Sequence, residues 1–209
     1  CLFPLSLRAI ITLAGENSMS AKAEPNRLKP VDTRGGAKKA SAQKSVVQKD
    51  HRLFELEVMI IGGLMTKSFM KTNPRPTRTI ELRGDQTLEK LHDTIFKAFD
   101  RFDPHMYEFR LNAESPRDKH ADRYVPSELL EDPWYREKAV ADTENTTFGS
   151  LGLSSGSNFL YWFGFGDDWW HKIKVTSISE KAEGKGYPKI TARTGESPPQ
   201  YVDRDEIEN

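Results

Sequence analysis

The sequence has a single cysteine, Cys1, among 209 residues, and none of its apolar runs approaches the roughly 18 residues of a membrane span. One thiol excludes an internal disulfide and a cysteine zinc site, and it suits a reducing compartment. No GxxxxGK[ST] or GxGxxG string leads from a strand into a helix, and the HExxH string is also missing. We therefore expect a cytoplasmic protein with no membrane association and no nucleotide cofactor.

Net charge is also lacking, because the formal total is zero, but the charges are unevenly spread. Residues 20–50 carry eight Lys and Arg against three Asp and Glu, a net of +5, which leaves the remainder acidic. Residues 16–51 hold almost no aromatic side chain, so they lack the apolar surface that folding needs. We predict that residues 1–51 form a disordered basic arm, interpreted as a solvating leader, with DNA binding through this arm as an alternative function.

The first residues need a separate interpretation. Residues 2–14 are apolar, but Arg8 interrupts them and no basic start precedes them, as a signal peptide would require. We interpret residues 1–18 as a fragment or reading-frame artefact that is not part of the natural protein, with a start at Met19. An export segment is the alternative.

Ordered structure is predicted over residues 52–199, with a flexible tail over residues 200–209. From Thr87 the apolar period changes to 3.6 residues, which predicts a helix that ends before Pro104. Its apolar stripe consists of Leu88, Leu91, Ile95, Ala98, Phe99 and Phe102. Residues 112–145 are charged and irregular, and we predict a long loop with a short helical piece near Leu129 and Leu130.

Alternating apolar residues predict several strands around this helix. They cover residues 53–60, 77–82, 106–111, the two arms of a hairpin over 159–175, and a short last strand at 187–191. The order of elements indicates an α+β fold: a single roll-like domain with a mostly antiparallel sheet and one principal helix packed on it.

The hairpin over residues 159–175 is the most informative stretch of the sequence. Period-2 alternation divides its side chains between two faces. One face receives Phe159, Tyr161, Phe163 and Phe165, together with Trp169, His171, Ile173 and Val175 after the turn. The other face receives Trp170, Lys172 and Lys174, which we predict to be a partner-binding surface, either a protein contact or a platform for base stacking.

One set of residues is a candidate for chemistry, namely His92, His105, Asp167, Asp168 and His171. If the helix packs behind the hairpin, these side chains could converge on a divalent metal such as zinc or manganese that activates water. Their spacing matches no recognised ligand motif. The structural alternative is a histidine at the edge of the core and two ordinary turn aspartates, so we assign no catalytic residue and expect no cofactor beyond this metal hypothesis.

Several strings together resemble a known family. They are Thr87-Leu88 with Leu91-His92, His105 with Glu108-Phe109, Phe165-Gly166-Asp167 with Trp169 and His171, Tyr187-Pro188, Gly195-Glu196 and Pro198-Pro199. The sequence is similar to the plasmid Ri ORF-three-like family, often labelled as insertion-element passenger proteins of TnpR type, from about Leu53 to Pro199. The resemblance implies a compact prokaryotic α+β roll of unestablished biochemical function, found beside mobile-element genes.

The sequence thus favours a non-enzymatic binding or accessory module that acts through the aromatic hairpin on a protein or nucleic-acid partner. A metal-dependent hydrolase or nuclease using His92, His105, Asp167 and His171 is the enzyme alternative. A serine recombinase is disfavoured, because no serine nucleophile stands within an arginine cluster.

Overall fold

The structure is a computed structural model that describes residues 49–202. These residues form one eight-stranded sheet with the strand order β5-β4-β3-β6-β7-β1-β2-β8. Its strands are β1 (Leu53–Gly62), β2 (Thr77–Arg83), β3 (Tyr107–Leu111), β4 (Asp122–Val125), β5 (Ala139–Asp142), β6 (Asn158–Phe163), β7 (Trp169–Ser179) and β8 (Lys189–Thr194). All neighbours pair antiparallel except β4 and β5, which are parallel.

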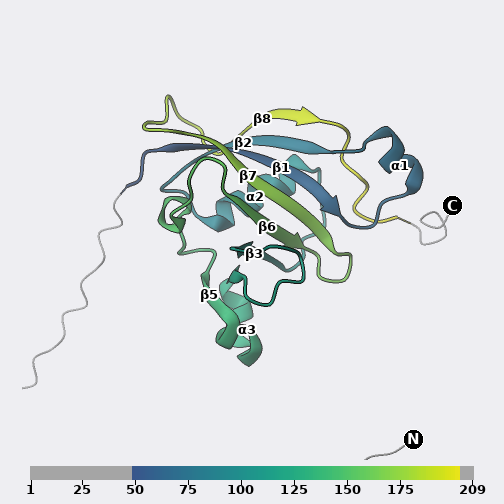
Figure 1. Ribbon diagram of the computed structural model, residues 1–209, viewed down its shortest axis with the longest axis horizontal. Coiled ribbons are helices and arrows are strands. Elements are labelled where there is room, and N and C mark those ends of the chain that lie inside the picture. Colours follow the sequence, from purple (N-terminus) through teal and green to yellow (C-terminus); the bar gives the residue numbers. More distant parts are fainter. Residues whose placement is uncertain (1–48, 203–209) are drawn as a thin grey trace, which may run out of the picture. The chain divides into compact units, whose positions relative to one another are not determined.

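The helices are few and unequal in length. They are α1 (Lys67–Thr72), α2 (Leu88–Ala98), α3 (Pro133–Lys138) and the two 3-10 turns η1 (Ser127–Glu131) and η2 (Phe148–Leu151). Figure 1 shows α2 behind the central strands, α1 in the connection from β1 to β2, and α3 next to β5. The predicted fold class, α+β with a mostly antiparallel sheet and one principal helix, is confirmed.

Helix α2 supplies one side of the core. The hydroxyl of Thr87 accepts a hydrogen bond from the Lys90 amide, as expected of an N-cap. The buried side chains of the helix are Leu88, Leu91, Ile95 and Ala98. Burying each large aliphatic side chain contributes about 1.5–3 kcal/mol, so packing against the sheet holds the helix in place.

The predicted stripe of this helix was wrong at its last member. Helix α2 ends at Ala98, and Asp100 takes a φ of 55°, outside the helical range. Phe102 therefore falls beyond the 3.6-residue periodicity, and its side chain is 71% exposed.

The two arms of the main hairpin are β6 and β7, and their side chains divide between two faces as predicted. On the inner face the buried residues are Phe159, Tyr161, Phe163, Trp169, His171, Ile173 and Val175. Phe165 is the exception, because it lies in the turn and stacks on Trp162 of the outer face, with ring centroids 4.2 Å apart. A residue in the turn no longer follows strand alternation.

The segment over residues 112–145 has more structure than the loop we expected. The helical piece around Leu129 and Leu130 is present as η1, but α3 and the strands β4 and β5 were missed. Each of these strands has only four residues. Such a length is too short for alternation to stand out from a charged background.

Both ends of the described region make specific contacts. The Asp50 carboxylate accepts hydrogen bonds from Arg52 and lies against Gly84 and Gly149, where an added Cβ would come within 2.4 Å and 1.9 Å of it. At the other end Gln200, which we had placed in the tail, is 3% exposed. Most of the predicted arm, residues 1–48, lies outside the described residues.

The side chain of Arg78 in β2 is buried in the core and joins several elements. Its guanidinium donates to the carbonyl oxygen of Ala98 at 2.7 Å, at the end of α2. It also donates to the carbonyls of Thr194 and Gly195, both at 3.1 Å, and to the Ser197 hydroxyl at 2.8 Å. Every nitrogen of this buried cation therefore has a hydrogen-bond partner.

We expect Arg78→Met to lower the free energy of unfolding by about 3 kcal/mol or more, because it removes the charged hydrogen bonds that join the buried guanidinium to the end of α2, the end of β8 and Ser197. Urea denaturation measures the loss. Arg75→Met is the matched control, since Arg75 is exposed three residues away, and it should change stability by less than about 0.5 kcal/mol. Equal small effects of the two substitutions would contradict the role given to Arg78.

Candidate functional site

The first candidate ligand, His92 on α2, is held among aromatic rings. Its ring stacks on Tyr107 with centroids 3.6 Å apart and an interplanar angle of 4°. Its Nδ1 hydrogen-bonds the Tyr161 hydroxyl at 2.7 Å. Burial lowers the pKa of His92 to about 4, so the ring is neutral near pH 7.

His171 lies inside the core on β7. It is 1% exposed, and its ring centroid is 5.0 Å from that of Phe99 and 5.2 Å from that of Tyr161. Burial, together with the nearby charge of Arg101, lowers the pKa of His171 to about 3. This histidine is therefore also neutral.

The remaining candidates lie nearer the surface. His105 is exposed and hydrogen-bonds the Tyr201 hydroxyl at 2.7 Å, and the carboxylate of Asp103, which accepts from the same hydroxyl, raises the pKa of Tyr201 to about 12. Asp168 accepts from the indole Nε1 of Trp162 at 3.0 Å, and Asp167 belongs to the same turn.

The predicted metal site does not assemble. Within residues 49–202, no three His, Cys, Asp or Glu side chains are arranged to hold a metal ion. The imidazoles instead surround the aromatic rings of β6: His92 and His171 lie beside Tyr161, and His105 lies 5.7 Å from Phe163. Aromatic packing, not ligation, accounts for their positions.

The outward face of the hairpin carries a stack of aromatic rings. Trp162 and Trp170 are directly opposite each other in the β6–β7 register, and their rings are 4.8 Å apart and nearly parallel. The guanidinium carbon of Arg110 on β3 lies 5.0 Å from each ring centroid. This geometry is that of a cation–π contact, and Arg110 is itself paired with the buried carboxylate of Glu108.

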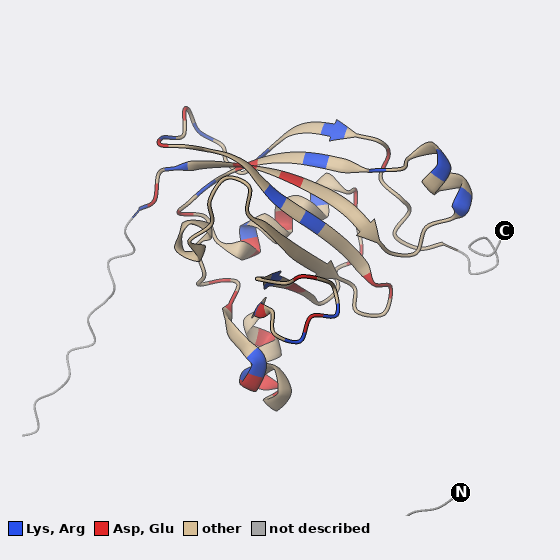
Figure 2. Cartoon of the chain, in the orientation of Figure 1, with Lys and Arg blue, Asp and Glu red and all other residues tan. Residues whose placement is uncertain are grey.

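Next to this stack, Lys172 and Lys174 are exposed on β7. Lys172 lies between Leu160 and Met59 in the register, and Lys174 lies opposite Glu57. Figure 2 shows the resulting basic bands on β7 beside an acidic band on β1. A shallow hollow of about 260 Å³ is lined by Glu57, Met59, Asn158, Lys172 and Lys174.

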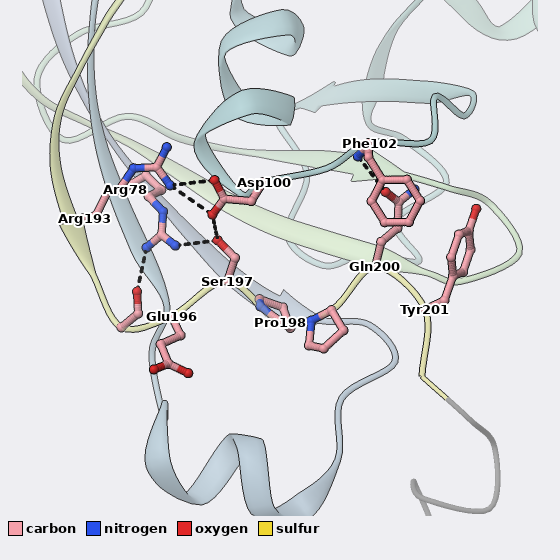
Figure 3. Close-up of a pocket in the computed structure, with 11 residues that line it drawn as sticks. Arg78, Asp100, Phe102, Arg193, Glu196, Ser197, Pro198, Gln200 and Tyr201 are labelled. Carbon is pink, nitrogen blue, oxygen red and sulfur yellow. Dashed lines mark hydrogen bonds and ion pairs between the residues drawn. The ribbon is translucent and has the colours of Figure 1, made fainter.

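A larger cavity of about 590 Å³ opens at the end of α2, between β8 and residues 195–202 (Figure 3). Two of the charged groups in this cavity, Arg193 and Asp100, are paired with each other. Arg193 donates to Asp100 at 3.1 Å, and the Ser197 hydroxyl donates to the same carboxylate at 2.5 Å. The hydrogen bond from Ser197 and the charge of Arg193 lower the pKa of Asp100. The exposed ring of Phe102 forms part of its wall.

The predicted outward facing of Trp170, Lys172 and Lys174 agrees with the structure, but the neighbours of these residues were not predicted. The position of Trp162 could have been predicted, because alternation with the inward Tyr161 and Phe163 places it on the outward face. Arg110 and the cavity residues carried no local signal, since their contacts join segments far apart in the sequence.

The fold and these surfaces define a single-sheet α+β domain covered by one principal helix. The chain belongs to the family described as plasmid pRiA4b ORF-3-like protein, which matches residues 67–204, so the resemblance predicted from the sequence is confirmed. No curated protein matches the chain. Within the described part of the chain, none of the helices has the length and apolar character needed to cross a membrane.

A solved structure shares the fold. It is the crystal structure of a protein of unknown function, MM3350, from Methanosarcina mazei Go1. The two are 21% identical with a TM-score of 0.50, and the match covers 68% of this chain and 69% of that chain. The likeness supports the arrangement of strands and helices and says nothing of activity.

We expect the free energy of unfolding to fall as the pH drops from 7 to 5. His92 and His171 stay neutral in the folded protein, whereas the unfolded chain takes up protons near their ordinary pKa of about 6.5. Each histidine contributes a slope of at most about 1.4 kcal/mol per pH unit. Urea denaturation at several pH values measures this slope.

His171→Leu should roughly halve the slope, and the same substitution at the exposed His120 serves as the control. A pH dependence that His171→Leu leaves unchanged would show that His171 is not buried in its neutral form.

Proposed function

We propose that this protein is a non-enzymatic binding module whose partner, another protein, contacts the outward face of the β6–β7 hairpin and the neighbouring part of β1. The observation that carries the proposal is the grouping of Trp170, Lys172 and Lys174 on one uncovered face. Helix α2 packs on the opposite face, and Figure 1 shows no described helix across the near face of β7 and β1.

The surface combines apolar contact area with positive charge. Met59 is partly buried beside Lys172, and Ile61, at an irregularity in the β1–β7 pairing, is 42% exposed. Interfaces typically join such an apolar centre to a polar rim. The long lysine side chains can cover apolar surface while keeping their ammonium groups in water.

A protein partner fits this surface better than a nucleic acid does. Glu57 stands opposite Lys174, so the charge is mixed where a phosphate backbone would need it to be positive. Base stacking needs an open ring face, but Trp162 has Trp170 on one side and Phe165 stacked on it as well. Gly62 lies against Trp170 from β1. The platform for bases is therefore largely occupied.

The two other functions have less support. The metal-dependent hydrolase would need His92, His105, Asp167 and His171 to meet, and they do not form a ligand set. DNA binding through the basic arm depends on residues that lie outside the described region. A cytoplasmic location and an association with mobile elements remain part of our proposal, supported by the single cysteine and by the plasmid family.

Photo-crosslinking tests the contact surface. A photoreactive residue at position 172, in the protein expressed in its natural host, should give one dominant protein adduct. Position 181, an exposed lysine in the loop after β7, is the matched control and should not give it. A salt-sensitive adduct with nucleic acid instead would move the proposal to a nucleic-acid partner, and identical adducts at both positions would contradict the surface.

Substitution of the two neighbouring tryptophans should separate folding from binding. Trp169 is 0% exposed, and Trp169→Ala should cost about 3–5 kcal/mol of stability. Trp170→Ala removes the outer stack on Trp162, worth about 0.5–1.5 kcal/mol beyond its buried area, and the cation–π contact with Arg110, worth about 0.5–1 kcal/mol, so the protein should fold and lose the adduct. Equal destabilisation by both substitutions, measured by urea denaturation, would contradict the assignment of Trp169 to the core and Trp170 to the outward face.

A further inference from the structure

On the inner face of β7, three buried side chains carry polar atoms that have no hydrogen-bond partner. They are Arg101, Trp169 and His171, with exposed fractions of 7%, 0% and 1%. The unpartnered atoms are Nε and Nη2 of Arg101, Nε1 of Trp169, and both ring nitrogens of His171. Buried polar atoms in folded proteins nearly always have partners, so a cluster of this kind calls for an explanation.

The cation in this cluster lacks a counter-charge. Arg101 makes no ion pair with any carboxylate among residues 49–202, and its one hydrogen bond runs from Nη1 to the carbonyl oxygen of Pro198 at 3.0 Å. The adjacent Asp100 is used by Arg193 and Ser197. Burying a guanidinium without an anion is costly, and Arg78 shows how this fold satisfies a buried arginine where it serves structure alone.

Stacking explains part of the arrangement. The guanidinium carbon of Arg101 lies 3.9 Å from the centroid of the Trp169 ring, which is a close cation–π contact. This contact engages the flat face of the guanidinium. It leaves the N–H groups at the edge of the guanidinium, and the indole N–H of Trp169, without acceptors.

The unpartnered groups are mostly donors. Arg101 offers two nitrogens and Trp169 offers one N–H, whereas a neutral His171 carries one N–H and one acceptor nitrogen and lies beside the backbone of Trp169 and Tyr161. Donors that gather around a positive charge complement an oxyanion. We propose that Arg101, Trp169 and His171 form a binding site for a small oxyanion, a carboxylate or a phosphate group, closed in this structure by the strap of residues 195–202.

The strap covers the cluster through polar contacts. The carbonyl oxygen of Pro198 accepts a hydrogen bond from Nη1 of Arg101, as an oxygen of the bound anion would. Gln200 accepts from the amides of Phe102 and Asp103 at 3.0 Å and 3.1 Å. Water can replace such hydrogen bonds when the strap moves, and Gly195, with a φ of 70°, is the first residue of the strap, at a position that favours glycine.

The route to the cluster starts from the cavity of Figure 3. Asp100 and Phe102, the chain neighbours of Arg101, line this cavity together with Pro198 and Gln200 of the strap. Displacing the Pro198 carbonyl would join the cavity to the guanidinium. This site lies on the face of β7 opposite Trp170 and Lys172. The anion-site proposal can therefore be tested independently of the proposed partner surface.

An NMR titration of the whole chain tests the site. The four tryptophan side chains give four indole N–H signals, and a Trp169→Phe variant identifies the one of interest. Inorganic phosphate and acetate are added separately, with chloride at matched ionic strength as the reference. We expect a saturable shift of the Trp169 signal alone; a response to phosphate only or to acetate only assigns the class of anion.

Two arginine variants sharpen the test. Arg101→Met should abolish the shift and leave the thermal midpoint no lower than that of the native chain, because an unpaired buried charge has been removed. Arg193→Met is the matched control: it loses an arginine from the same cavity, but one already paired with Asp100, and it should keep the shift.

A Trp169 signal that no anion moves, or that chloride moves equally, overturns the proposal whatever the variants do. So does a shift that persists in Arg101→Met. A fall of the Arg101→Met midpoint by more than about 5 °C would show that the guanidinium is structural, again contradicting the proposal.

Discussion

The buried guanidinium of Arg78 is the constraint on which the arrangement of the open end of the sheet depends. Its hydrogen bonds fix the last carbonyl of α2, the end of the edge strand β8 and the Ser197 hydroxyl relative to β2. The strap of residues 195–202 must therefore cross the segment that follows α2. That crossing places the Pro198 carbonyl on Arg101. The fold thus contains two buried arginines, Arg78 with a hydrogen-bond partner for every nitrogen and Arg101 largely without partners.

Strand β7 carries the two proposed sites on opposite faces. Its inward residues Trp169 and His171 are buried in the core, where Trp169 stacks against Arg101 and His171 packs beside Phe99, whereas Trp170 and Lys172 lie on the other face. A shift of one residue in the pairing with β6 would exchange these sets, so the register that holds the core also determines which surface is presented. Core stability and the proposed partner binding should thus be separable by substitution at adjacent positions.

Sequence patterns predicted those parts of the fold that depend on residues close together in the sequence. Alternation was sufficient for the two faces of β7, and the 3.6-residue period was sufficient for α2. The short strands β4 and β5 were not predicted, because alternation cannot be recognised over only four residues. The contacts of Arg78 with Ser197 and of Arg101 with Pro198 join residues about a hundred positions apart, and no local sequence pattern predicts such contacts. The converging histidines were predicted from residue type alone, and aromatic packing separates them.

We propose that the outward face of β7 and β1 binds the partner. Hydroxyl-radical footprinting of the whole chain, with and without the partner captured by crosslinking, tests this surface. We expect protection of Trp170 and Met59, with no change at Phe102, which is 71% exposed, lines the larger cavity and serves as an internal control. Protection of Phe102 with none at Trp170 or Met59 would show that the partner binds elsewhere.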